Sequence, residues 1–164
     1  MSQCEILIPR SFKLHIQFIS HSDDKTPYSG VSMKRILLCD DSNMMLTILT
    51  KRLTDAGFQI VGKGMDGEEG YKLFCELKPD LMLLDVTMPN KDGRQCLSDI
   101  LAAHPTASII MVSALADEEL QKSCIQAGAK AFITKSNLST VEDFDKHVAS
   151  VIHSIFGDQN RQAA

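Results

Sequence analysis

Five side chains of this sequence have types that suit chemistry on a phosphoryl group: Asp40, Asp41, Asp85, Ser113 and Lys135. Three carboxylates form an oxygen-only set of ligands, which favours a hard divalent ion, and so small a set suits Mg²⁺. A carboxylate beside such an ion can attack phosphorus as a nucleophile. The lysine would add positive charge and the hydroxyl a hydrogen bond. Such chemistry requires a fold that brings the five residues together.

Short apolar runs alternate with longer segments of helical period, five times over, from Met33 onwards. This alternation predicts a parallel sheet with helices on both faces. The second run is the least apolar and is the best candidate for an edge strand. The predicted strands are 35–39, 59–63, 81–84, 108–112 and 131–134.

The five candidate residues directly follow four of these runs. Carboxyl ends of parallel strands meet at one edge of an open sheet and form its ligand crevice. We therefore predict an α/β fold, a doubly wound five-stranded parallel sheet of order 2-1-3-4-5, the flavodoxin-like (β/α)5 arrangement. Adjacent strands lie about 4.8 Å apart, so Asp85 would lie beside Asp40 and Asp41. Crowded carboxylates repel and need neutralisation, which again indicates Mg²⁺.

Capping residues predict where the helices begin and end. Ser42 can cap a helix that runs to Ala56, with Gly57 ending it, and Asp66 and Asp92 (or Gly93) can open the next two. A capping-box pattern at 139–142 predicts the start of the last helix, and Gly157 its end.

These boundaries predict a domain over residues 33–157, preceded by an extension and linker at 1–32 and followed by a tail at 158–164. The stretch 22–30 is polar and contains Pro and Gly, as linkers do. Apolar and polar residues alternate over 12–18, the period of a half-buried strand. The extension could thus add one strand or be disordered, and a third alternative is that Met33 is the natural start.

Composition excludes several classes of protein. Hydrophobic residues make up 44% and charged residues 23%, as in soluble globular proteins, and no apolar run reaches the roughly 20 residues of a membrane span. The net charge of -4 offers no basic surface for direct nucleic-acid binding. Five dispersed cysteines without a C-x-x-C pair indicate reduced thiols and a cytoplasmic location.

Over about residues 33–156 the sequence closely resembles the receiver domain of two-component response regulators. The resemblance rests on Asp40-Asp41 after the first strand, Leu-Leu-Asp-Val-Thr-Met-Pro-Asn-Lys-Asp-Gly over 83–93, Val-Ser-Ala around Ser113, and Lys-Ala-Phe-Ile-Thr-Lys ending at Lys135. Each motif alone is weak, and their joint placement is specific.

The resemblance implies a role for each matching residue. Asp85 would be the phosphoacceptor, charged from the phosphohistidine of a sensor histidine kinase or a phosphotransfer protein. Asp41 would bind Mg²⁺ directly, Asp40 mainly through water, and Thr87 through its backbone carbonyl. Lys135 would be the family's essential lysine.

The family's switch matches Ser113 and Phe132, an aromatic that changes rotamer between states. The resemblance places the signalling face on helix four, strand five and helix five, and it makes Thr87 and Leu115 the positions that tune the phosphorylation lifetime. The output protein is not identified; a flagellar motor and a phosphorelay are both open. Few residues follow the last helix, so we expect a stand-alone receiver or a piece of a larger protein.

Many receivers carry proline after the essential lysine, often with a cis peptide, whereas this sequence has Ser136 there. A cis bond before a residue other than proline costs about 2.5 to 4 kcal/mol. We therefore expect a trans peptide between Lys135 and Ser136, and a following loop that differs from that of other receivers.

Three other functions fit these residues less well. A haloacid-dehalogenase-type phosphatase also uses an aspartate and Mg²⁺, but its Asp-x-Asp follows the first strand. A flavodoxin-like electron carrier would find its flavin phosphate repelled by Asp40 and Asp41. A degenerate receiver, used only for binding, would not need the intact acidic set. We expect no enzyme activity beyond the domain's own phosphotransfer and dephosphorylation.

Overall fold

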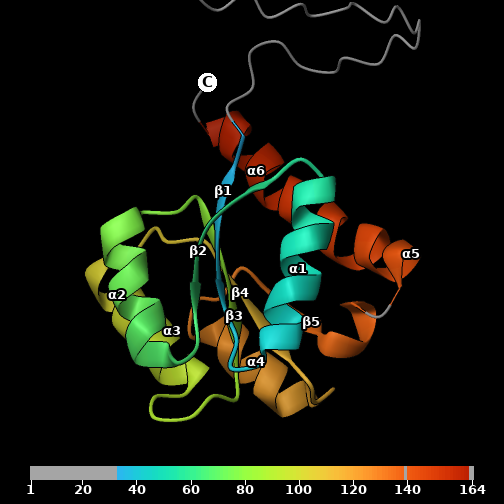
Figure 1. The fold of residues 1–164 in the computed structure, drawn as a ribbon. Coiled ribbons are helices and arrows are strands. Elements are labelled where there is room, and N and C mark those ends of the chain that lie inside the picture. The colour runs from blue at the N-terminus through green and yellow to red at the C-terminus, as the bar shows by residue number, and fades with distance from the viewer. Residues whose placement is uncertain (1–32, 139, 163–164) are drawn as a thin grey trace, which may run out of the picture. The chain divides into compact units, whose positions relative to one another are not determined.

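The computed structural model describes residues 33–138 and 140–162, with side chains described as far as 157. Its centre is a five-stranded parallel sheet of order β2-β1-β3-β4-β5, as predicted, with β2 at an edge (Figure 1). The strands are β1 Arg35–Cys39, β2 Gln59–Gly64, β3 Leu81–Asp85, β4 Ile109–Ser113 and β5 Ala131–Thr134.

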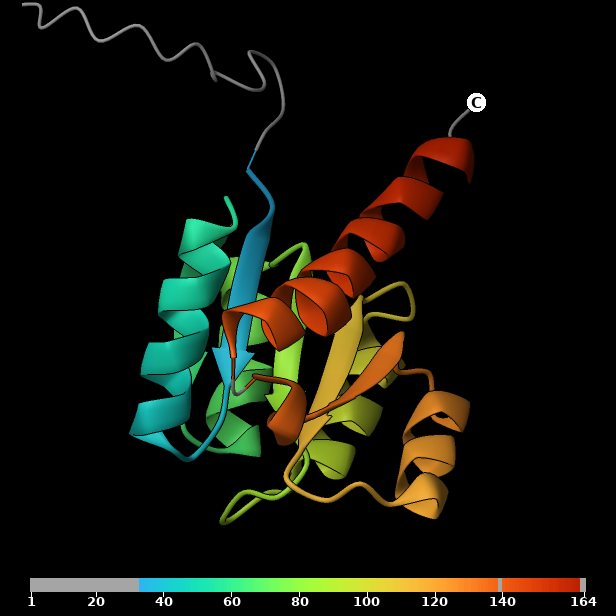
Figure 2. The ribbon, with the colours of Figure 1, turned by 90° about the vertical axis from the view of Figure 1, so that its right-hand side faces the viewer.

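Helices cover both faces of this sheet because successive strand residues point to opposite sides. Ile36 and Leu38 pack on the face covered by α1 (Asn43–Asp55), α5 (Val141–Phe144) and α6 (Ser150–Gln162). Leu37 and Cys39 pack on the other face, against α2 (Gly67–Leu77), α3 (Gly93–Ala103) and α4 (Glu118–Gln126). Figure 2 shows α1 and α6 on the same side of the strands. Both faces of the sheet are therefore occupied by hydrophobic core.

Three predicted caps are confirmed. The Ser42 hydroxyl accepts a hydrogen bond from the Met45 amide at 3.4 Å. Asp66 accepts from the first-turn amides of α2, and Asp92 accepts from the Gln95 amide of α3. Gly57 follows the end of α1 with φ of +88°, a backbone conformation that glycine adopts without steric strain.

The prediction for the last helix was wrong at both ends. Thr140 caps it, with its hydroxyl accepting from the Asp143 amide at 3.0 Å, so the capping pattern lies one residue later than predicted. A five-residue π-helical segment, η2 (Asp145–Ala149), joins α5 to α6. Gly157 is not among the positive-φ residues and lies inside α6, so it continues the helix and does not form the left-handed cap that commonly ends one. The predicted tail is therefore helical as far as 162.

Two candidate site residues belong to strands instead of following them. Asp85 is the last residue of β3 and pairs with Val112, and Ser113 is the last residue of β4 and pairs with Thr134. The parallel ladder continues one residue beyond each apolar run, because backbone pairing does not require an apolar side chain. Both residues are therefore held by the sheet itself.

The four cysteines of the described residues are free thiols. Cys39, Cys96 and Cys124 are buried, Cys75 is half-buried, and none of these four forms a disulfide. The possible strand at 12–18 and the linker at 22–30 lie outside the described residues. In the part of the chain that the structure describes, every helix is too short or too polar to span a bilayer.

Candidate phosphoacceptor site

Three carboxylates meet at the carboxyl edge of the sheet, as predicted. One oxygen atom from each of Asp40, Asp41 and Asp85 lies within 4.8 Å of the others. Asp40 and Asp85 are 2% and 3% exposed, whereas Asp41 is exposed. Two buried carboxylates and one exposed carboxylate thus form a cluster that is open to solvent on the Asp41 side.

Asp40 is held in place by backbone and side-chain contacts. Its Oδ1 accepts a hydrogen bond from the Ser42 amide at 2.9 Å, and its own amide donates to the Gly64 carbonyl at 3.1 Å. Its Oδ2 lies 2.8 Å from Lys135 Nζ. The start of α1 and Lys135 thus hold the carboxylate, while the end of β2 holds the backbone of Asp40.

Lys135 reaches the cluster from a distant strand. It follows β5, which neighbours β4 and neither β1 nor β3. Its Nζ nevertheless lies 2.8 Å from Asp40 Oδ2 and 3.1 Å from Asp85 Oδ2, because the long side chain crosses the end of β4. One cation thus bridges the two buried carboxylates.

Burial and neighbouring charges shift the pKa values of Asp85 and Lys135. Burial raises the pKa of Asp85, and the negative charge of Asp40 raises it further. The positive charge of Lys135 lowers this pKa but does not outweigh burial, so the pKa stays above its usual value. Burial lowers the pKa of Lys135, but its hydrogen bond to Asp40 and the charge of Asp85 outweigh burial and raise that pKa overall. The lysine therefore remains a cation at neutral pH.

The other predicted site residues lie around this cluster. Ser113 is 1% exposed, and its hydroxyl accepts a hydrogen bond from the Leu115 amide at 3.1 Å. Thr87 and Leu115 are exposed, as residues that contact incoming molecules would be. Phe132 on β5 is half-buried and packs against the core beneath α4. The roles of these four residues stay predictions.

A model of the response regulator receiver domain family matches residues 36–148, more than half of the chain. The chain belongs to this family. The match covers β2 to β5, all of β1 except its first residue, and every residue of the cluster. It thus establishes the protein as a receiver domain of two-component response regulators.

Relatives of this receiver include a chemotaxis protein and a response regulator. It is 38% identical to the chemotaxis protein CheY of Listeria monocytogenes, over 63% of this chain and 87% of that protein. It is 36% identical to the response regulator GacA of Pseudomonas viridiflava, over 63% of this chain and 49% of that protein. A CheX-CheY-BeF3-Mg complex from Borrelia burgdorferi contains a chain that is 35% identical, with a TM-score of 0.68, covering 75% of this chain and 89% of that chain.

The peptide bond after the lysine is trans, as expected. The structure contains no cis peptide bond within the described residues, so the bond between Lys135 and Ser136 is trans. Residues Lys135–Leu138 form a short 3-10 helix, and the Ser136 hydroxyl lies 2.9 Å from that of Thr134. The receiver therefore presents Lys135 without a proline behind it.

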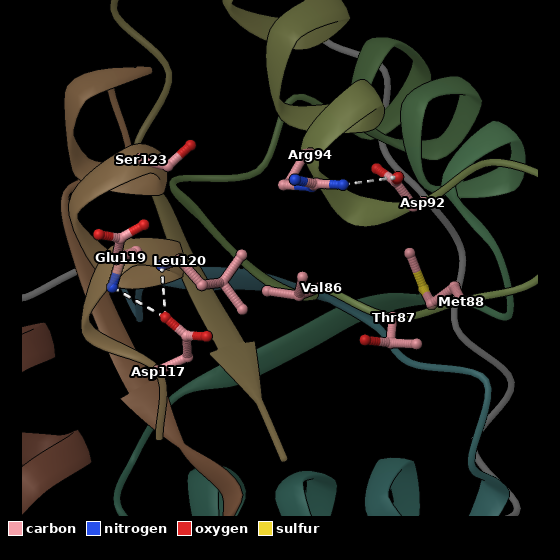
Figure 3. A pocket seen from close by; sticks show the side chains of 9 residues that line it. All are labelled: Val86, Thr87, Met88, Asp92, Arg94, Asp117, Glu119, Leu120 and Ser123. Atoms are coloured by element: carbon pink, nitrogen blue, oxygen red, sulfur yellow. Dashed lines mark hydrogen bonds and ion pairs between the residues drawn. The ribbon is translucent and has the colours of Figure 1, made fainter. Parts of the chain in front are cut away.

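A cavity of about 550 Å³ lies between the loop after β3 and α4 (Figure 3). Val86, Met88 and Leu120 supply apolar lining, and Thr87 lies at its edge. Charged side chains also line it, and Arg94 contacts Asp92 at 3.6 Å. Because Thr87 lies only two residues after Asp85, a molecule that occupied this cavity would contact the segment beside the cluster.

The raised pKa of Asp85 predicts how the stability of the metal-free receiver changes with pH. The folded state holds this proton more tightly than the unfolded state, whose aspartate pKa is about 3.9. The stability due to Asp85 is fully present below pH of about 3.9 and is lost as pH rises through the folded-state pKa. The variant Asp85→Asn should therefore gain stability relative to the wild type as the pH rises above about 4. Urea unfolding at several pH values without Mg²⁺ measures this; a difference that does not change with pH would contradict the raised pKa.

One set of contacts near the site was not predicted. The Asn90 side chain donates to Asp66 Oδ2 at 3.0 Å, which joins the loop after β3 to the first turn of α2. Asp66 was interpreted only as a helix cap, and Asn90 only as part of the family motif. The sequence shows a capping aspartate with a second carboxylate oxygen and an asparagine in the loop. Whether the two side chains meet depends on how α2 packs against that loop.

Proposed function

We propose that this receiver accepts a phosphoryl group on Asp85 from the phosphohistidine of a sensor histidine kinase or a phosphotransfer protein. The observation that carries the proposal is a buried carboxylate, 3.1 Å from a lysine ammonium and in contact range of two further carboxylates at a strand end. The membership of the receiver family supports it.

In the proposed reaction, an oxygen of the ionised Asp85 attacks phosphorus as the nucleophile. The new bond joins that oxygen to phosphorus, while the phosphorus–nitrogen bond to the donor imidazole breaks. The bonding electrons pass to the imidazole nitrogen, which takes up a proton. Lys135 already contacts the attacking carboxylate, so its charge can stabilise the transferring group without moving far.

We propose Mg²⁺ as the cofactor, held by Asp40, Asp41, Asp85 and the Thr87 carbonyl. The described cluster offers carboxylate oxygens and one solvent-facing side, which fits an ion that retains several waters. When bound, Mg²⁺ neutralises the oxygens of the transferring group. The CheX-CheY-BeF3-Mg complex from Borrelia burgdorferi supports this choice, because it contains Mg with a related receiver.

We propose that Ser113 and Phe132 transmit the phosphorylated state to the surface of α4, β5 and α5. The Ser113 hydroxyl is bound to the Leu115 amide. If it turned to a phosphoryl oxygen, that hydrogen bond would break and the loop before α4 would be released. A pull-down with and without beryllofluoride would identify an output protein. A cytoplasmic location stays a prediction.

Replacing the exposed ligand tests the metal site. The variant Asp41→Ala should bind Mg²⁺ roughly tenfold more weakly or worse, since it removes one of few charged ligands. Isothermal titration calorimetry with MgCl₂ measures the affinity. Asp55→Ala, at the opposite end of α1, removes an equal charge and only an exposed ion pair with Lys51. Unchanged affinity in Asp41→Ala would show that the ligands lie elsewhere.

Incubation with acetyl phosphate and Mg²⁺ tests the phosphoacceptor function directly. The intact protein should gain the mass of one phosphoryl group. We propose that it turns over no external substrate. Rapid release of phosphate from many unrelated phosphoesters would support the phosphatase alternative, and a protein that never takes up the label would be a degenerate receiver used only for binding.

A further inference from the structure

The loop after Asp85 is fixed at its two ends by the sheet and by α3. The Val86 amide donates to the Val112 carbonyl of β4 at 2.9 Å, and the Gly93 amide donates back to the Val86 carbonyl at 2.9 Å. Thr87 lies just inside the first of these anchors, and its amide contacts the Asp85 carboxylate. The direction of the Thr87 carbonyl therefore depends on how the middle of the loop is held.

The middle of the loop is held by α2. Asn90 Nδ2 donates to Asp66 Oδ2 at 3.0 Å, and the Gly67 amide donates to the Lys91 carbonyl at 3.0 Å. A Cβ atom on Gly67 would lie only 2.5 Å from that carbonyl, so the helix and the loop are in direct contact. Asn90 has φ of +62°, a left-handed conformation that asparagine tolerates better than most residues. Two adjacent loop residues are thus attached to the start of α2.

Asp66 connects this attachment to the acidic pair. Its Oδ1 accepts from the Glu68 and Glu69 amides at 2.9 Å, so one carboxylate both caps α2 and holds the loop. Its backbone carbonyl accepts from Cys39 Sγ at 3.1 Å. Cys39 directly precedes Asp40 in the chain. One residue therefore contacts both segments that carry the proposed Mg²⁺ ligands.

We propose that the hydrogen bond between Asn90 and Asp66, called here the Asp66–Asn90 bridge, sets the position of the Thr87 carbonyl and so determines the affinity for the divalent ion. Asn90 and Asp66 are positioning residues and touch neither the ion nor the phosphoryl group. This inference rests on the proposed function, because it assumes the metal site at Asp40, Asp41 and Asp85.

Replacing Asn90 by aspartate tests the bridge, because loss of the bridge and the added negative charge should change the Mg²⁺ affinity in opposite directions. Asn90→Asp places two carboxylates against each other and should displace the loop, weakening Mg²⁺ binding about tenfold. A negative charge added near a cation site without any positional effect would instead tighten binding. Gln95→Glu, which adds the same charge on the exposed first turn of α3, is the control and should leave affinity unchanged or slightly tighter.

Two further variants separate the effect of the hydrogen bond on Mg²⁺ affinity from the effect of the added charge. Asn90→Gly deletes the amide but keeps the left-handed backbone accessible, and it too should weaken binding. The exchanged pair Asp66→Asn with Asn90→Asp rebuilds a donor and an acceptor between the same positions and should restore most of the affinity. The measurements are Mg²⁺ titration calorimetry without any phosphodonor, and the Mg²⁺ concentration that gives half-maximal phosphorylation by acetyl phosphate.

The outcomes distinguish this inference from the function on which it rests. The expected result is weaker binding in both single variants and recovery in the exchanged pair, with little change in the rate at saturating Mg²⁺. Unchanged or tighter binding in Asn90→Asp and Asn90→Gly, alongside weaker binding in Asp41→Ala, would overturn the bridge alone. Unchanged binding in Asp41→Ala would overturn the metal site itself.

Discussion

The variant Asp85→Asn is expected to lose phosphorylation by acetyl phosphate, with a fall in rate of roughly 10³-fold or more. Asparagine fills the same space and can still accept a hydrogen bond from Lys135, but its neutral amide oxygen is a poor nucleophile for phosphorus. Acid-quenched samples analysed by intact mass after a time course would measure the effect. The fold should remain intact, because the substitution relieves repulsion with Asp40.

Asp80→Asn is the matched control for this loss. Asp80 directly precedes β3, at the opposite end of the same strand from Asp85, and its Oδ2 accepts from the Arg35 amide at 2.7 Å. The asparagine can keep this hydrogen bond, so phosphorylation should be unaffected. A phosphoryl label retained in Asp85→Asn and mapped to another residue would show that the nucleophile has been assigned wrongly.

The variant Gly93→Ala is expected to lower the free energy of unfolding by about 3 kcal/mol. The added Cβ would lie 1.9 Å from the Asp85 carbonyl oxygen and 2.9 Å from its carbonyl carbon. Both are backbone atoms, so no side-chain rotation can relieve the overlap, and α3 or the end of β3 must move. Urea unfolding followed by circular dichroism measures the loss, and a slower phosphorylation of Asp85 should accompany it.

Gly157→Ala is the opposite case and serves as the control. Gly157 lies inside α6, and a Cβ placed there meets no atom within 4 Å. Alanine favours a helix interior over glycine, so this variant should gain roughly 0.5 to 1 kcal/mol. If Gly93→Ala were as stable as the wild type, β3 and α3 would not approach as closely as the structure has them.

Local sequence patterns predicted the strands, the site residues at the strand ends and three of the helix caps. The apolar runs predicted all five strands to within a residue or two, because burial on both faces demands apolar side chains at nearly every position of the central strands β1, β3 and β4. The motif residues around Asp40, Asp85 and Ser113 followed from the strand ends, since parallel strands align their carboxyl ends at one edge. Ser42, Asp66 and Asp92 were recognisable as caps because capping acts within one helical turn.

The capping pattern at 139–142 and Gly157 predicted the wrong ends for the last helix. Ser139 and Thr140 are adjacent hydroxyl residues that both precede acidic residues three positions on, so the sequence offers two capping patterns of nearly equal quality. The structure uses Thr140. Gly157 can stop or continue a helix at an energy difference of about 1 kcal/mol, too small to decide the outcome without the rest of the helix.

The sequence alone determined which residues stand at the edge of the sheet; tertiary structure decided which of them touch. Lys135 could be placed after β5, but only the twist and order of the strands let its Nζ reach both Asp40 and Asp85. The contact between Asn90 and Asp66 likewise depends on the packing of α2 against the loop after β3. Strand periodicity is a local property of the chain, whereas these contacts join residues far apart in sequence and exist only once the helices have packed.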